Sequence, residues 1–321
     1  MRDTTIEQQF AEALKSAARR QDVKQHLKQS PLLYGLVSRA ARRFVTGDAM
    51  QDALDAAARL ESRAYLVSLE FIGENVTSLT ECRQAVQQFR ELIRSAGAMG
   101  RPGRISLDLS HIGLSIDSEL ASQHLQELAQ EAGLNGCTLM ISMEESAKTD
   151  SILALYKEAA SRYPQIGITL QAHLYRTPGD LEELLPLQGS LRIVKGAYQE
   201  PALQAMPRSD ALNERFAALV RRCIQAKRFV SAATHDEPLI EKLVQEGLLH
   251  SEHSELEMLY GIRPELSGRM KEAGLRVRIY LTYGEAWYLY LCHCLAEHPP
   301  NIYTAVADMI RGGNGADENY K

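Results

Sequence analysis

The sequence predicts an α/β fold, a (βα)8 TIM-like barrel preceded by an N-terminal helical arm. Three observations support this prediction. The chain of 321 residues has room for one barrel. From about residue 65, short apolar runs alternate with longer amphipathic segments, as in a parallel sheet. No G-x-G-x-x-G or P-loop motif follows any apolar run, which counts against the alternative of a doubly wound, Rossmann-type sheet.

The first part of the chain is predicted to be helical. The stretches AEALKSAARR and QDALDAAARL have helical periodicity with no strand between them, and Pro31 and Gly35 interrupt the region. We therefore expect a helical arm over residues 1–60 and a barrel over 61–312. The Gly-rich, polar end, RGGNGADENYK, predicts a disordered tail over 313–321.

Eight β-branched, apolar runs are the expected strands of the barrel. They span residues 64–70, 104–109, 137–143, 166–172, 192–197, 228–234, 255–260 and 276–281. Helical segments such as CRQAVQQFRELIRSAG and NERFAALVRRCIQAK separate them. This alternation gives the order expected for a closed parallel barrel.

The composition indicates a globular protein. Hydrophobic residues make up 45% of the chain, charged residues 24%, and the net charge is −5, which argues against a nucleic-acid-binding surface. No apolar run approaches the roughly 20 residues of a membrane-spanning helix, and the N-terminus has no apolar signal core. The five cysteines form no recognisable disulfide framework. We expect a cytoplasmic protein.

Polar and ionisable residues lie at the ends of nearly all the expected strands. Catalytic groups of such barrels lie at the C-terminal strand ends. The residues at these ends are Glu70, Glu74, Asp108, Ser142, Glu144, Gln171, His173, Lys195, Thr234, His235, Glu257 and Tyr280. As a group they predict a polar pocket over the barrel.

The segment RIVKGAYQEP combines several groups that suit a bound ring or phosphate. Lys195 supplies a cation, Gly196 leaves the backbone open to close approach, and Tyr198 adds an aromatic ring. Arg192 could reach a ring or phosphate from the same strand. An ordinary βα loop is the alternative that this segment alone leaves open.

Several motifs together resemble the proline dehydrogenase family, especially its short monofunctional bacterial members. In order, they are LEFIGENV, SLDLSHIGL, ISMEES, QAHLYR, RIVKGAY, ATHD, EMLYGIRPEL, RIYLTYGEAWYLY and LAEHPPN, from about residue 66 to 301. The resemblance implies a distorted (βα)8 barrel that holds FAD non-covalently. It also implies oxidation of L-proline to Δ1-pyrroline-5-carboxylate, with a hydride passing to the flavin and electrons then passing to a second acceptor.

The resemblance carries particular roles onto this sequence. Those implied for flavin binding are Gln171, Arg192, Val194, Lys195, Gly196, Ala197, Tyr198, Thr234 and His235. Those implied on the substrate side are Tyr198, Tyr280, Glu74 and Glu297. These roles are physically reasonable, because an anionic pyrophosphate and an electron-accepting ring both favour nearby cations and hydrogen-bond donors.

The sequence departs from the family where the substrate carboxylate is gripped. Family members end in Tyr-x-x-Arg-Arg-x-x-Glu, whereas this chain reads Tyr290-Leu-Cys-His293-Cys294-Leu-Ala-Glu297. Helical spacing predicts that Tyr290, His293, Cys294 and Glu297 lie near one face. Asp108 replaces the family's lysine. Ser142 likewise stands in place of a family aspartate.

Losing three cationic partners would weaken carboxylate binding by several kcal/mol, because hydrogen bonds to charged groups contribute about 1.5–3 kcal/mol each. Three readings follow. The chain oxidises a proline-derived cyclic imino acid, in a natural-product pathway of the carbapenem type; it still oxidises L-proline, using Arg263 or His293; or it is a non-catalytic flavin-binding or regulatory protein. Glu74, Asp108 or Glu297 would assist deprotonation.

The expected partners are a cyclic imino acid and an electron acceptor, either a quinone or a small redox protein. Meeting a quinone implies peripheral contact with the inner membrane surface. A zinc site is not expected, because Cys292, His293 and Cys294 point in different directions on a helix and no second ligand pair has metal-site spacing. Ser110-His111 gives no argument for a hydrolase triad.

Overall fold

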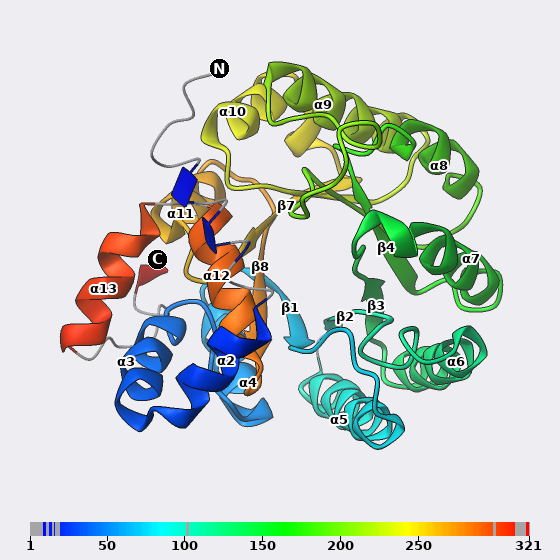
Figure 1. Ribbon diagram of the computed structural model, residues 1–321. Helices are drawn as coiled ribbons and strands as arrows, with labels where there is room; N and C mark the ends of the chain where they lie inside the picture. Colours follow the sequence, from blue (N-terminus) through cyan, green and yellow to red (C-terminus); the bar gives the residue numbers. More distant parts are fainter. Residues whose placement is uncertain are drawn as a thin grey trace.

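Eight parallel strands close into a barrel in their order along the chain, and β8 pairs with β1 (Figure 1). The strands are β1 (Leu66–Phe71), β2 (Arg104–Leu107), β3 (Thr138–Ile141), β4 (Ile166–Gln171), β5 (Leu191–Val194), β6 (Val230–Ala233), β7 (Ser254–Leu259) and β8 (Val277–Tyr283). This computed structural model describes residues 9–10, 13–14, 16, 20–100, 103–297, 300–311 and 319–320.

Helices cover the outside of the barrel and bury their apolar faces against the strands. They are α5 (Leu79–Ala98), α6 (Ser118–Leu134), α7 (Thr149–Ala160), α8 (Thr177–Leu184), α9 (Asp210–Gln225), α10 (Glu237–Gln245) and α11 (Pro264–Glu272). Caps fix where several of them begin. The Asp117 carboxylate accepts the backbone N–H of Leu120 at 3.0 Å before α6, and Ser209 accepts that of Leu212 before α9.

The predicted barrel and the eight predicted strands are confirmed, but several strands end earlier than expected. β5 ends at Val194, so Lys195, Gly196 and Ala197 lie in the following loop. Gly196 has a φ of 110°, and a Cβ there would lie 2.1 Å from the His173 ring. Only glycine tolerates both constraints, and it stands where the backbone leaves the sheet.

The N-terminal region is helical, as predicted, but part of it belongs to the barrel. Its helices include α2 (Gln21–Gln29), α3 (Pro31–Ala41) and α4 (Met50–Ser62). The apolar face of α4, including Ala53 and Leu60, packs into the same core as β1 and β8. This part of the expected arm is therefore a wall of the barrel.

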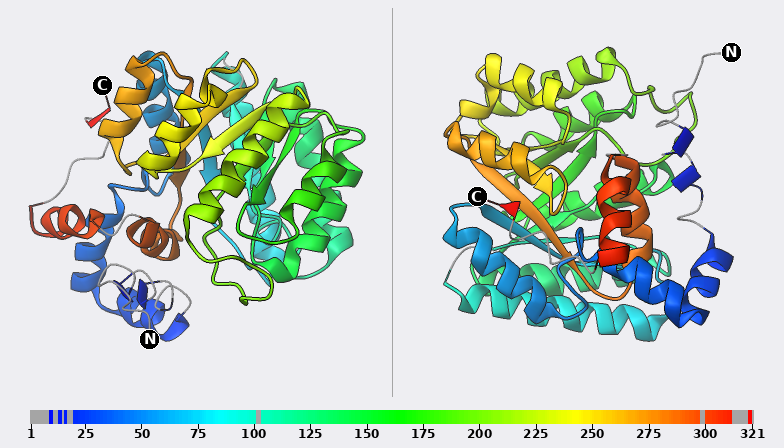
Figure 2. Two further views of the ribbon diagram at one scale, coloured as in Figure 1. Left: turned by 90° about the horizontal axis from the view of Figure 1, so that it is seen from above. Right: turned by 90° about the vertical axis from the view of Figure 1, so that its left-hand side faces the viewer.

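A second, smaller core joins α3 to α12 (Trp287–Glu297) and α13 (Asn301–Arg311). These helices and α2 gather on one side of the barrel (Figure 2). An ion pair also links the segment after α3 to α13. The Arg43 guanidinium donates to both carboxylate oxygens of Asp308, at 2.6 and 3.0 Å. The position of α12 follows from this packing.

The expectation of a disordered tail over 313–321 is wrong at Tyr320. Its ring is buried, stacks on Tyr260 at a centroid distance of 5.8 Å, and meets Tyr65 edge-on. Its hydroxyl accepts the backbone N–H of Gly261 at 2.8 Å. An aromatic ring whose hydroxyl is hydrogen-bonded gains free energy from burial. The polar, Gly-rich composition around Tyr320 gave no sign of this burial. Residues 312–318 and 321 lie outside the described residues.

Within the described ranges, no helix is both long enough and apolar enough to cross a lipid bilayer.

Candidate active site

A cavity of about 260 Å³ lies over the C-terminal ends of the barrel strands. Its lining includes Gln171, Arg192, Val194, Lys195, Gly196, Ala197, Tyr198, His235, Tyr280 and His293, all expected from the sequence. Tyr280 is on β8 and His293 on α12, so the fold gathers residues that are far apart in the chain. Mostly apolar walls with a few convergent polar groups are typical of a small-molecule site.

Arg192 is the central cation of this cavity. It is buried, and its guanidinium donates to Thr169 Oγ1 at 2.9 Å, Ser142 Oγ at 3.1 Å and Glu257 Oε1 at 3.1 Å. Its Cζ also lies 5.1 Å from the centre of the Tyr280 ring, within cation–π range. Neighbouring groups thus fix the guanidinium rigidly beneath the cavity.

A second charged layer supports Arg192 from inside the barrel. The Arg104 guanidinium donates to Glu255 at 2.8 Å and to Glu257 at 3.0 Å, and Arg278 donates to Glu255 at 2.8 Å. Although burial alone would raise it, these arginines lower the pKa of Glu255 to about 2. The barrel interior is therefore polar at this level, and Arg104 holds Glu257 in the position where it pairs with Arg192.

The Tyr280 ring is held over the cavity from a strand end. Its hydroxyl donates to Glu70 Oε2 at 2.6 Å, and burial raises the pKa of both groups. The protonated phenol donates this short hydrogen bond, and the Glu70 carboxyl accepts it. A ligand ring lying beside Tyr280 would meet an aromatic face whose orientation Arg192 and Glu70 fix.

The loops after β5 and β6 meet at one edge of the cavity. Lys195 forms an ion pair with Asp236, which also caps α10. His235 Nε2 accepts the backbone N–H of Leu259 at 2.8 Å, which fixes its ring against the cavity. The Thr234 hydroxyl instead accepts the backbone N–H of Asp236 at 3.2 Å, and Thr234 does not line the cavity. Its predicted contact with the cofactor therefore has no support in this geometry.

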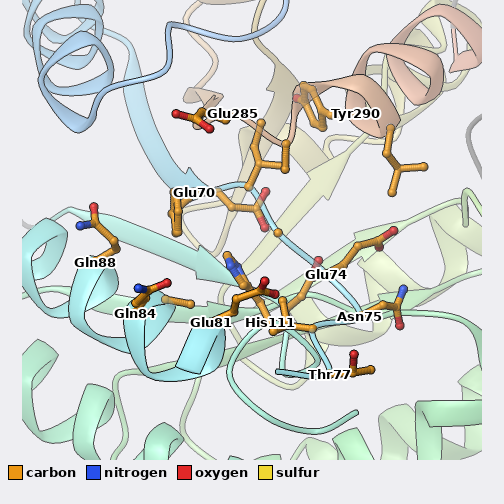
Figure 3. Close-up of a pocket in the computed structure, with 18 of the residues that line it drawn as sticks. Glu70, Glu74, Asn75, Thr77, Glu81, Gln84, Gln88, His111, Glu285 and Tyr290 are labelled. Atoms are coloured by element: carbon orange, nitrogen blue, oxygen red, sulfur yellow. The ribbon is translucent and has the colours of Figure 1, made fainter. Parts of the chain in front are cut away.

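Carboxyl groups crowd the opposite wall. Glu74 follows β1 and Asp108 follows β2, and both line a second cavity of about 1040 Å³, which shares lining residues with the first. Figure 3 shows Glu74 in this cavity, near Glu70 and His111. Burial raises the pKa of Asp108 well above its usual range, and the charges of Glu70 and Glu144 add to this effect. The wall where the resemblance implies a lysine therefore holds carboxyl groups whose charged form burial disfavours.

The structure separates two residues that the sequence placed together. His293 lines both cavities, and its ring meets Tyr198 edge-on at 6.4 Å. Cys294 is fully buried in the second core with Leu291 and Phe44, and does not line either cavity. The predicted common face was wrong for Cys294, because a residue one position along a helix points about 100° away. The side chain of Glu297 lies outside the described residues.

Sequence reasoning passed over several residues that shape the site. Glu70 and Glu257 were noted only as strand-end residues, yet they hold Tyr280 and Arg192. Arg208 lines the cavity and donates to the Gly196 carbonyl at 2.8 Å. Glu70 and Glu257 could have been found from buried acids at strand ends, which need partners. Arg208 lies in a long loop, and no periodicity places its side chain.

Glu74 should make stability depend on pH. Burial, reinforced by Glu144 and Glu145, raises its pKa from 4.5 to about 7. Folding favours the protonated Glu74 carboxyl, because its pKa is higher in the folded state. The stability that this carboxyl contributes is full below pH 4.5 and is lost as the pH rises through 7. Glu74→Gln should therefore leave the free energy of unfolding unchanged near pH 4 and raise it by about 2 kcal/mol at pH 8.

Urea unfolding of the ligand-free protein at both pH values measures this difference. Glu81→Gln is the matched control, since Glu81 lines the same cavity but is exposed. An equal effect of Glu74→Gln at pH 4 and pH 8 would contradict the proposed burial of its charge.

The described residues contain no group of three or more His, Cys, Asp or Glu side chains that could hold a metal ion.

Known proteins resemble this chain in sequence and in fold. Residues 53–292 match the family described as Proline dehydrogenase. The chain is 31% identical to Proline dehydrogenase 1 of Bacillus subtilis (strain 168), over 84% of this chain and 91% of that protein. It is also 31% identical to Proline dehydrogenase of Deinococcus radiodurans, over 96% of this chain and 100% of that protein.

A solved structure of proline utilization A (PutA) from Bdellovibrio bacteriovorus, inactivated by N-propargylglycine, has the same fold. The TM-score is 0.75 at 16% sequence identity, and the match covers 96% of this chain and 40% of that protein. This chain therefore spans less than half the length of that PutA, and the likeness supports the fold alone.

Proposed function

The chain belongs to the proline dehydrogenase family of oxidoreductases, and from this premise we propose that it is FAD-dependent and oxidises a proline-derived pyrrolidine whose carboxylate is masked or absent. One observation carries the proposal. The flavin side of the pocket keeps the residue types that the resemblance implies, while the substrate side holds the acids Asp108 and Glu74, which give a carboxylate no cationic partner.

The residues of the smaller cavity suit a flavin ring. Arg192 is a fixed, buried cation, and the backbone at Gly196 is bare of a side chain. Gln171 and Lys195 line the same space and offer polar groups at its edge. FAD, when bound there, would supply the acceptor for a hydride and its two electrons. Arg192, Lys195, Gln171 and His235 would hold and orient it.

The substrate side argues against free L-proline in the family's pose. Asp108 and Glu74 supply no positive charge to pair with a carboxylate, and Cys294 lies in the core where an arginine is implied. His293 and the Tyr290 hydroxyl are the donors that the described part of α12 offers to the cavity, and neither carries the permanent charge of an arginine. A pyrrolidine ring between Tyr198 and Tyr280, carrying an ester, an amide or another uncharged group, needs no cationic partner.

Other parts of the interpretation stay predictions. These are the electron acceptor, quinone or small redox protein, a cytoplasmic location with peripheral contact at the membrane, and a role in natural-product biosynthesis. The relatives named above are proline dehydrogenases and carry no sign of such a role. The rival function is that of a non-catalytic flavin-binding or regulatory protein, and reduction of the bound flavin distinguishes the two.

The test is to load the purified protein with FAD and titrate it without oxygen. We expect a bound-flavin spectrum that L-prolinamide bleaches and that L-proline leaves oxidised at the same concentration. Bleaching by L-proline alone would make the chain a genuine L-proline dehydrogenase. A flavin that neither compound reduces would favour the binding protein, and a protein that takes up no FAD would overturn the proposed function.

A further inference from the structure

The larger cavity extends the substrate side of the site. Its volume is about 1040 Å³, and it lies among the segments after β1 and β2, the start of α5 and the start of α12 (Figure 3). Glu70, Asp108, Tyr198, Tyr290 and His293 line both cavities, so the two spaces meet at these side chains. A ring beside Tyr280 could therefore extend a substituent into the larger space.

Negative charge dominates the lining of this larger cavity. Its acidic side chains are Asp48, Glu70, Glu74, Glu81, Asp108 and Glu285. Arg20 is the one arginine or lysine among its described lining residues, and it already forms an ion pair with Asp22. An anionic substituent would meet this field unfavourably, and a cationic one would be attracted.

Two acids of the larger cavity, Asp108 and Glu74, form no ion pair in the part of the chain that the structure describes, although the charge of Lys148 partly offsets that of Glu74. Lys148 pairs with Glu144 at 2.6 Å and with Glu145 at 3.0 Å, and Arg192 pairs with Glu257. Among the residues that the structure describes, no lysine or arginine forms an ion pair with Asp108 or Glu74. Burial, reinforced by the charges of neighbouring acids such as Glu144 and Glu70, raises the pKa of both carboxyl groups, and a bound cation would favour their charged forms.

His111 gives an independent indication of a ligand that donates N–H groups. It lines the larger cavity, is only 5% exposed, and its Nδ1 has no hydrogen-bond partner in the described structure. Burial lowers the pKa of His111 to about 4, so the ring is neutral near pH 7. Its bond to the backbone of Phe71 is then left to Nε2, and Nδ1 is an acceptor in need of a donor.

We propose that the substrate is a pyrrolidine with a second, cationic amine on a short arm, and that Asp108, Glu74 and His111 line the space which receives this ammonium group. The arm takes the direction in which the resemblance places the carboxylate of proline. The inference rests on the proposed function, because it assumes that the reacting ring lies beside Tyr280. A metal ion is not the occupant we infer, since the described acids do not form a metal-binding group.

The test measures binding to the FAD-loaded protein by isothermal titration calorimetry. The probes are 2-(aminomethyl)pyrrolidine, which carries the cationic arm, L-prolinamide, whose arm is neutral, and L-proline, whose arm is anionic. We expect the aminomethyl compound to bind at least tenfold more tightly than L-prolinamide, and L-proline to bind most weakly. Raising the salt concentration should reduce the first difference, because the attraction is electrostatic.

Variants separate the cavity charges from charge elsewhere on the protein. Asp108→Asn should weaken binding of 2-(aminomethyl)pyrrolidine about tenfold and change binding of L-prolinamide little. Glu145→Gln is the matched control, because Glu145 is an acid outside the lining of both cavities. Thermal unfolding of each variant with the probe, followed by its melting temperature, gives a second readout that does not depend on turnover.

The two proposals fail in different ways. Equal affinity for 2-(aminomethyl)pyrrolidine and L-prolinamide, or an Asp108→Asn variant that keeps the full preference, would overturn the cationic arm while the flavin spectrum stays normal. A protein that takes up no FAD would instead refute the proposed function.

Discussion

Replacing Asp108 with lysine and His293 with arginine in one protein is expected to tighten L-proline binding by about 100-fold or more. The double variant removes one carboxylate from the substrate wall and adds two cations to it. Hydrogen bonds to charged groups contribute about 1.5–3 kcal/mol each, and 1.4 kcal/mol corresponds to a factor of ten. Titration of the FAD-loaded variant with L-proline, followed by calorimetry and by flavin absorbance, measures the gain.

Cys294 is left unchanged in this variant for a structural reason. Its side chain is fully buried in the core between α3 and α12, so Cys294→Arg would bury an unpaired charge. We expect that substitution to lower the free energy of unfolding by about 3 kcal/mol or more. The outcome that would refute our account of the substrate wall is a folded Asp108→Lys/His293→Arg protein with unchanged affinity for L-proline.

Arg192→Met is expected to be the most damaging single change in the barrel interior. It removes the donor to Thr169, Ser142 and Glu257, and the cation over the Tyr280 ring. Glu257 keeps Arg104 as a partner, so we expect a loss near the lower end for a broken buried ion pair, about 3 kcal/mol. Urea unfolding measures this loss, and flavin absorbance after gel filtration should show at least tenfold weaker FAD retention.

Arg192→Lys is the matched variant, because it keeps the charge but loses the planar fork. Compared with Arg192→Met, it should recover part of the lost free energy of unfolding. It should not restore the contact that orients the Tyr280 ring, so substrate affinity should stay weak. If Arg192→Met were to unfold at the same urea concentration as the unchanged protein, the buried network would contribute nothing to stability, and our account of it would be wrong.

The chain order of the barrel was determined by local sequence alone. Eight apolar runs predicted eight strands, because buried parallel strands need continuous β-branched and aliphatic residues, and the structure confirms each of them. The motif RIVKGAY also placed Arg192, Lys195, Gly196 and Ala197 at one strand end, and these residues line one cavity. These features depend on residues close together in the chain, whose geometry is set by the strand itself.

The tertiary structure decided which side chains share a space. Helical spacing could not tell that His293 faces the cavities while Cys294 faces the core, because packing against α3 sets the rotation of α12. The burial of Tyr320 depends on Tyr65 and Tyr260, which lie far away in the sequence. The acidic cavity arises in the same way, since loops after β1 and β2 and helix α12 meet only in the closed barrel. Local sequence fixes periodicity, but the contacts between distant segments that create a site's charge and shape form only on folding.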